Sequence, residues 1–171
     1  PLYATKAVDP IIINAGDGAH EHPTQALLDM YSILEKKESL EGLKVVIIGD
    51  IMHSRVARSN IYGLTKMGAD VHLAGPRTMV YPELEKLGVT VHHDIREAVA
   101  NADVVNVLRI QLERIHSALY PTNREYARIF GINNEVLKLA KDDVMVMHPG
   151  PMNRGLEIAP DVAYSDQSVI Q

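Results

Sequence analysis

Short apolar runs alternate with amphipathic stretches along most of the chain. The run over 44–49 is continuous and β-branched, which is typical of a strand buried on both faces. Residues 23–37 place apolar side chains at helical spacing directly after a proline, a residue favoured at the first helical position. The same patterns predict further helices over 54–67, 82–87, 95–101, 124–130 and 134–140, and strands over 11–14, 71–74, 89–92, 104–108 and 144–147.

This strand–helix–strand alternation predicts an α/β fold, a doubly wound parallel sheet with helices on both faces. A length of 171 residues is near the usual size of one domain, so residues 1–171 are expected to form a single domain. Ligands of such sheets bind at the carboxyl ends of the strands. The residues that follow each predicted strand are therefore the candidates for a functional site.

The composition of the chain argues against several classes of binding partner. The formal net charge is −5 and no run of Lys or Arg exceeds two residues, so neither nucleic acid nor a membrane surface is expected to be bound. No apolar stretch approaches the roughly 20 residues that span a bilayer, and the absence of cysteine excludes disulfides and fits a cytoplasmic location. The chain starts at Pro1 and ends without a clear terminating element, so a piece of a longer protein is expected.

Two arginines follow predicted strands and are candidates for binding anions. Arg55 falls in the first turn of a helix, where a cation is disfavoured unless an anion binds beside it. Its alternative role is a solvated charge or an ion pair with Asp50. Arg109 directly follows an apolar strand and could be oriented by Glu113, although a surface ion pair is equally compatible with the sequence. Together the two guanidiniums could hold two carboxylates bidentately, with Gln111 adding a neutral contact.

His22 and Gln25 lie on either side of a predicted helix start. A histidine there can donate to a developing oxyanion, and the positive helix end is expected to lower its pKa. The alternative is a helix-entry residue that packs on Pro23. His20, His22 and His53 also raise the question of a metal site, but no recognised ligand spacing is present and no metal is predicted.

Two glycine-containing turns complete the candidates. Gly49 stands alone after its strand, without the further glycines of a dinucleotide-binding or phosphate-binding loop, so no nucleotide cofactor is expected. The turn that contains Pro149, Gly150 and Pro151 is stiff, and either X–Pro bond could be cis. It is compatible with a simple tight turn or with a site where backbone carbonyls meet a ligand.

Five segments of the chain form an ordered set of motifs: 14–18 (NAGDG), 22–29 (HPTQALLD), 49–50 with 53–59 (GD and HSRVARS), 109–114 (RIQLER) and 148–155 (HPGPMNRG). Together they resemble the carbamoyltransferase family, and its aspartate branch in particular. The resemblance covers most of the chain and keeps the family's order of motifs. The ornithine branch typically carries cysteine in two of these motifs, and this chain has none.

The resemblance implies an activity and a set of roles. A carbamoyl group would pass from carbamoyl phosphate to the amine of L-aspartate, giving N-carbamoyl-L-aspartate and phosphate in pyrimidine biosynthesis. Arg55 and Arg109 would bind the aspartate carboxylates with help from Gln111, and His22 would polarise the carbamoyl carbonyl. Further contacts to the carbamoyl group are implied for Gln25, Gly150 and Pro151, with Pro149 and Glu113 in supporting positions.

One part of the family pattern is missing. The Ser-Thr-Arg-Thr phosphate loop of the family's first half does not occur, so this chain is expected to supply only the aspartate side, as an L-aspartate-binding domain. The resemblance implies that a first-half domain and neighbouring catalytic subunits, in a homotrimer, complete the site. The chain alone is then expected to be inactive. The alternatives are a free-standing dicarboxylate or amino-acid binding module and, on fold analogy alone, a nucleotide-linked oxidoreductase.

Overall fold

A computed structural model describes residues 2–111 and 120–170, and over these ranges the chain forms one five-stranded sheet. All strands run parallel, in the spatial order β3-β2-β1-β4-β5. The strands are β1 (Lys44–Ile48), β2 (Asp70–Ala74), β3 (Thr90–His92), β4 (Val104–Val107) and β5 (Met145–Met147).

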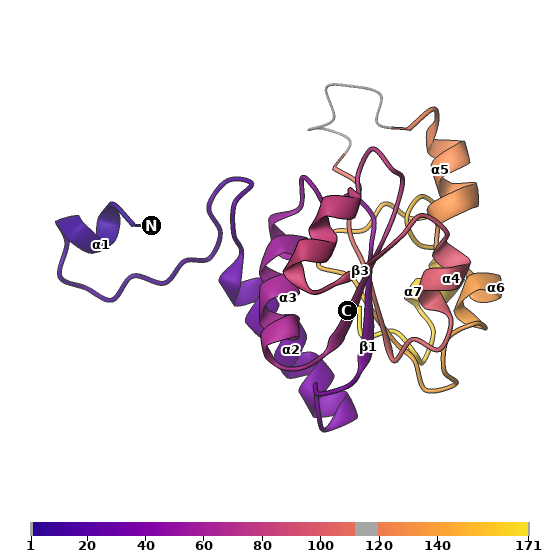
Figure 1. Ribbon diagram of the computed structural model, residues 1–171, viewed down its shortest axis with the longest axis horizontal. Coiled ribbons are helices and arrows are strands. Elements are labelled where there is room, and N and C mark those ends of the chain that lie inside the picture. The colour runs from indigo at the N-terminus through magenta and orange to yellow at the C-terminus, as the bar shows by residue number, and fades with distance from the viewer. Residues whose placement is uncertain (1, 112–119, 171) are drawn as a thin grey trace.

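Helices cover both faces of the sheet, which confirms the predicted doubly wound architecture (Figure 1). Helices α2 (Pro23–Lys37) and α3 (Arg55–Lys66) pack on one face, where Ile33 and Leu64 meet Ile47. The helices α4 (Ile95–Val99), α6 (Asn134–Leu137) and α7 (Pro160–Ala163) pack on the other face. The remaining elements are α1 (Ala4–Ala7), the 3-10 helix η1 (Pro82–Leu87) and α5 (Asn123–Phe130).

Most predicted elements are present with bounds shifted by a few residues. Helix α2 has the predicted bounds, and its end coincides with Glu38, which adopts a left-handed conformation. Helix α3 is capped by Ser54, because the Ser54 hydroxyl accepts a hydrogen bond from the Ala57 N–H at 3.1 Å. The single-turn helices α1 and α7 were not predicted, since four residues are too few to show a helical period.

The strand predicted over 11–14 is wrong. These residues form no regular element and lie on the extended arm that carries α1 away from the sheet (Figure 1). Ile11 is 92% exposed and Ile13 is 74% exposed. A strand requires a neighbour with which to exchange backbone hydrogen bonds, and an apolar run cannot by itself show whether a neighbour is within reach.

The order of the strands decides where a ligand can bind. The chain leaves β1 toward β2 and β3, then returns to place β4 on the other side of β1. The Ile48–Val107 pair ends this ladder, so the loops that follow β1 and β4 start side by side. Such a reversal opens a crevice at the carboxyl ends of the two strands.

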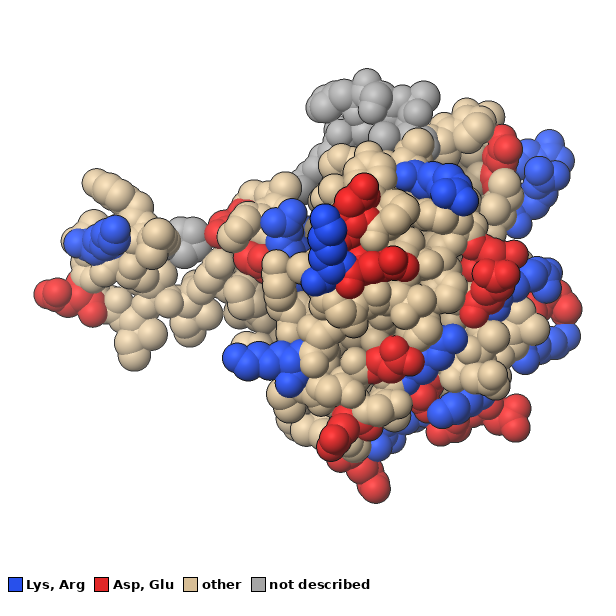
Figure 2. Space-filling model, viewed as in Figure 1, with Lys and Arg blue, Asp and Glu red and all other residues tan. Residues whose placement is uncertain are grey.

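Charges of both signs are interspersed on the face of the molecule seen in Figure 2. Among residues 2–111 and 120–170, no helix combines the length and the apolar character needed to cross a bilayer.

We predict that the stability of the chain depends on Ile47 and not on Ile11. Ile47 is fully buried in the central strand, so Ile47→Ala should lower the free energy of unfolding by about 2–5 kcal/mol. Ile11→Ala removes the same atoms from an exposed side chain and should change it by less than about 0.5 kcal/mol. Urea denaturation of both variants checks this, and equal losses would contradict the described core.

Candidate active site

A cavity of about 200 Å³ lies at the carboxyl ends of β1 and β4, where the strand order places the crevice. Four segments far apart in the sequence form its wall: the start of α2, the start of α3, the residues after β4 and the turn after β5. The lining residues are His22, Gln25, Ser54, Arg55, Val56, Leu108, Arg109, Gln111, Pro149 and Gly150. The structure therefore brings together most of the residues singled out from the sequence.

The start of α2 is held against α3 by hydrogen bonds. Pro23 occupies the first turn, and the backbone N–H of His22 donates to the Ser59 hydroxyl at 2.9 Å. The Ser59 hydroxyl in turn donates to the Glu21 carboxylate. These contacts fix the position of the His22 backbone relative to Arg55, which begins the same helix as Ser59.

Burial and a neighbouring cation keep His22 neutral. Desolvation lowers the pKa of His22 below its usual value, and the positive charge of Arg55 lowers it further. The direction of this pKa shift agrees with the prediction from the sequence. That prediction gave the positive helix end as the cause, whereas burial is the larger cause. The ring Nδ1 lies 3.4 Å from the Thr24 hydroxyl. A neutral imidazole beside a cation can donate one hydrogen bond to a carbonyl oxygen without losing its proton.

Arg55 extends from the first position of α3 across the loop over 14–18. Its Nη1 donates to the Gly18 carbonyl at 3.4 Å, which is long for such a bond. Gly16 lies so close that a Cβ there would be 2.6 Å from Nη1, and its φ of +128° also favours glycine. The ion pair with Asp50 considered above is absent, because the Asp50 carboxylate contacts His53 Nδ1 at 2.9 Å instead.

Arg109 and Gln111 reach the same cavity from the end of β4. Both side chains are half-buried, and Arg109 directly follows the buried Leu108. The predicted supporting role of Glu113 falls outside the described residues. Arg58, which follows Arg55 by one helical turn, lines a different groove beside Tyr62 and is exposed, as expected of a helix-surface charge.

The turn after β5 is built around the buried carboxylate of Glu157. His148 Nε2 lies 3.2 Å from a Glu157 oxygen, and the backbone N–H of Asn153 donates to the same oxygen. The Asn153 side chain also donates to the Ile110 carbonyl at 2.8 Å, which ties this turn to the residues after β4. The Gly150–Pro151 bond is cis. Gly150 lines the cavity, whereas Pro151 is exposed and does not.

Some residues of the site were not identified from the sequence. Ser54, Val56 and Leu108 line the cavity, and each lies next to a residue that was singled out. Glu157 was missed because it follows the motif that it organises and carries no local signal. Its role in the turn is shown by its contacts with His148 and Asn153.

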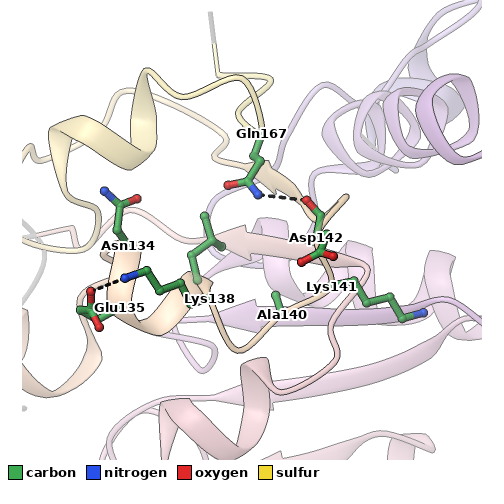
Figure 3. Close-up of a pocket in the computed structure, with 8 residues that line it drawn as sticks. Asn134, Glu135, Lys138, Ala140, Lys141, Asp142 and Gln167 are labelled. Atoms are coloured by element: carbon green, nitrogen blue, oxygen red, sulfur yellow. Dashed lines mark hydrogen bonds and ion pairs between the residues drawn. The ribbon is translucent and has the colours of Figure 1, made fainter.

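A larger hollow of about 480 Å³ lies near the beginning of β5 and is lined by α6, the segment 140–142 and Gln167 (Figure 3). Its lysines already have acidic partners. Lys138 Nζ contacts the Glu135 carboxylate at 2.7 Å, and Lys141 Nζ contacts the buried Asp103 carboxylate at 2.7 Å. The hollow is therefore larger than the crevice cavity, but both of its lysines are paired with carboxylates.

The three histidines near the cavity have different surroundings and do not form a cluster. His20 Nδ1 lies 3.7 Å from Asp17 and His53 contacts Asp50, while His22 faces the crevice. Within the part of the chain that the structure describes, no three His, Asp or Glu side chains are grouped so as to hold a metal ion.

Sequence comparison defines the class of protein to which this fold and this cavity belong. The sequence model of the aspartate/ornithine carbamoyltransferase Asp/Orn binding domain matches residues 41–171. The model of the carbamoyl-P binding domain of the same family matches residues 2–35, which include the arm and most of α2. The chain belongs to the aspartate/ornithine carbamoyltransferase family.

Within this family, two similar curated relatives carry the same name. The aspartate carbamoyltransferase catalytic subunit of Geotalea daltonii is 64% identical over 169 residues, which are 98% of this chain and 54% of that protein. That of Heliobacterium modesticaldum is 61% identical over 171 residues, which are 100% of this chain and 55% of that protein. The chain thus spans about half the length of the curated relatives it matches.

Solved structures of the family share the fold. Aspartate transcarbamoylase from Trypanosoma cruzi, in complex with aspartate and phosphate, has a TM-score of 0.77 at 30% identity. The match covers 96% of this chain and 53% of that one. Ornithine carbamoyltransferase from Pyrococcus furiosus has a TM-score of 0.74 at 34% identity, covering 89% of this chain and 51% of that one.

We predict that Arg55 contributes to the lowered pKa of His22. Arg55→Gln should raise the pKa of His22, and the value should stay below that of an exposed histidine because burial remains the larger cause. Arg58→Gln removes an exposed charge from the same helix and should leave the pKa of His22 unchanged. An NMR titration of the His22 ring in the three chains measures this. An unchanged pKa in Arg55→Gln would contradict the described proximity.

Proposed function

We propose that this chain supplies the aspartate side of a carbamoyl transfer from carbamoyl phosphate to L-aspartate, a step in pyrimidine biosynthesis. The observation that carries the proposal is the convergence of Arg55, Arg109 and His22 on one crevice cavity. The high identity to relatives named as aspartate carbamoyltransferase catalytic subunits supports it.

In this proposal the two arginines hold the two carboxylates of aspartate. Guanidiniums from the ends of neighbouring strands approach the ligand from different sides, and each can make two parallel hydrogen bonds to one carboxylate. Gln111 adds a neutral contact from the same loop as Arg109. The same positive wall would repel the cationic side chain of ornithine, which agrees with the aspartate name of the curated relatives.

The chemistry proposed for His22 follows from its neutral state. The aspartate amine attacks the carbamoyl carbon, and the bond from that carbon to the phosphate oxygen breaks. Phosphate leaves with the electron pair of that bond and takes up the proton that the amine loses. Negative charge develops on the carbonyl oxygen, and a neutral His22 donates a hydrogen bond to it. Gln25 holds the carbamoyl amide, and the backbone at Pro149 and Gly150 positions the amide and the incoming amine. Catalysis is then mainly orientation and oxyanion stabilisation.

The phosphate side of the site belongs to other parts of the proposed enzyme. We propose residues 1–171 as the aspartate-binding part, while a first-half domain and neighbouring catalytic subunits in a homotrimer supply the phosphate contacts. The missing Ser-Thr-Arg-Thr loop and the length of the relatives support this division. The match of residues 2–35 to the carbamoyl-P model is compatible with an arm that reaches toward that domain. A cytoplasmic location completes the proposal.

We predict that this chain has no carbamoyltransferase activity alone and gains it when the other part is supplied. The test is a chimera of the Geotalea daltonii subunit in which the 169 matched residues are replaced by this chain. Formation of N-carbamoyl-L-aspartate by the chimera is the expected result. Turnover by the isolated chain would contradict the division of the site, and an inactive but folded chimera would contradict the function.

We predict that Arg109 contributes directly to aspartate affinity. Arg109→Ala should raise the KM for aspartate in the chimera about 10- to 100-fold, the effect of losing charged hydrogen bonds to a carboxylate. Arg58→Ala, an exposed cation of α3 outside the cavity, is the matched control and should change KM less than about twofold. Similar KM values in both variants would remove Arg109 from the site.

The second candidate function is a dicarboxylate-binding module without chemistry, which the same arginine pair supports. Calorimetry with succinate on the isolated chain separates the two. A half-site should bind weakly, so submicromolar affinity would favour the module.

A further inference from the structure

A buried cluster of one carboxylate and two amides lies directly behind the cavity. Asp29 is 5% exposed, Asn60 is 0% exposed and Asn106 is 2% exposed. The Asp29 Oδ2 atom accepts from Asn60 Nδ2 at 2.6 Å and from Asn106 Nδ2 at 3.3 Å. The cluster therefore joins α2, α3 and β4, the three elements that carry or lead into Gln25, Arg55 and Arg109.

The remaining oxygen of Asp29 binds a cavity residue. Asp29 Oδ1 accepts a hydrogen bond from Gln25 Nε2 at 2.8 Å, one helical turn earlier on α2. An amide group is planar and has one donor end and one acceptor end. Because the donor end of Gln25 faces Asp29, its oxygen is the polar atom left for the cavity that Gln25 lines.

A carboxylate is the group that fixes this orientation. An ionised carboxylate only accepts hydrogen bonds, so Gln25 can approach it only with its NH₂ end. Burial raises the pKa of Asp29, and the amide hydrogen bonds from Asn60 and Gln25 oppose that rise because they favour the charged form. The three amide donors fit within the roughly four acceptor positions that the two oxygens of an ionised Asp29 offer.

We propose that Asp29 is a positioning residue that turns the Gln25 amide oxygen into the cavity, so that Gln25 accepts hydrogen bonds from the N–H groups of the carbamoyl amide. This inference rests on the proposed function. It adds a reason why the site recognises an NH₂ group: a ligand that presents only a carbonyl oxygen or an ester oxygen at this point would meet an acceptor and find no donor. Asn60 and Asn106 hold the carboxylate in place.

Asp29→Asn is the variant that tests the orientation with least disturbance. The Asn oxygen can take over the bonds from Asn60 and Asn106, while its NH₂ group replaces Oδ1 and donates to Gln25. All bonds are kept if the Gln25 amide reverses, which turns its NH₂ end into the cavity. In the chimera, kcat should fall about tenfold or more, as expected for losing one well-placed hydrogen bond and facing a donor instead. The KM for aspartate should stay within about twofold.

A double-mutant cycle separates positioning from a structural role. If Asp29 acts through Gln25, Asp29→Asn should reduce kcat in the otherwise unchanged chimera and have no further effect in a Gln25→Ala background. Ile33→Val, a buried change further along α2, is the control: it should lower the melting temperature and leave kcat and KM unchanged. Full additivity of the two variants, or an unchanged kcat in Asp29→Asn, would overturn the proposal.

A measurement on the unaltered 171-residue chain covers the case in which Asp29→Asn does not fold. The side-chain NH₂ resonances of Gln25, assigned by their loss in Gln25→Ala, should be widely split and slow to exchange because one proton is bonded to Asp29. Resonances typical of a free glutamine would overturn the orientation. An inactive wild-type chimera combined with the split resonances would refute the proposed function and leave the geometry standing, so the two failures are distinguishable.

Discussion

The pairing of β1 with β4 is the constraint on which the site depends. Because the chain returns across β1 after β3, the loops that follow β1 and β4 leave the sheet side by side and then diverge. Arg55 and Arg109 are 54 positions apart in the sequence numbering, yet this pairing brings both to one cavity. The turn after β5 joins them, since Asn153 is bonded to the Ile110 carbonyl. Without the reversal of strand order, these side chains would not line one cavity.

The electrostatics of the crevice follow from that convergence. Two guanidiniums and a neutral histidine line one cavity. Two carboxylates on neighbouring elements have other partners: Asp50 contacts His53, and Asp29 accepts from three amides. Arg55 makes one long hydrogen bond within the described residues, to the Gly18 carbonyl, and it lowers the pKa of His22. Cationic side chains that converge on one cavity favour an anionic ligand. In the proposed function this ligand is a dicarboxylate, with one carboxylate for each arginine.

Much of this arrangement could be predicted from the sequence, because local pattern sets local structure. Pro23 and the helical period defined α2, and continuous β-branched runs defined the buried strands. The strand ends then pointed to Arg55, Arg109 and the turn at Pro149. Ile11 shows one limit of sequence-based prediction. An apolar run indicates that side chains need burial, but it does not identify the surface against which they are buried. Asp29 and Glu157 show another limit: buried carboxylates act through partners that are distant in sequence, so no local pattern reveals them.

A crystal structure of the chain grown with succinate would show whether one dicarboxylate bridges Arg55 and Arg109. We expect density for one succinate in the crevice, with one carboxylate on each guanidinium and Gln111 beside it. Succinate bound in the hollow of Figure 3, or held in the crevice by a single arginine with its second carboxylate in solvent, would contradict a bridge between the two arginines.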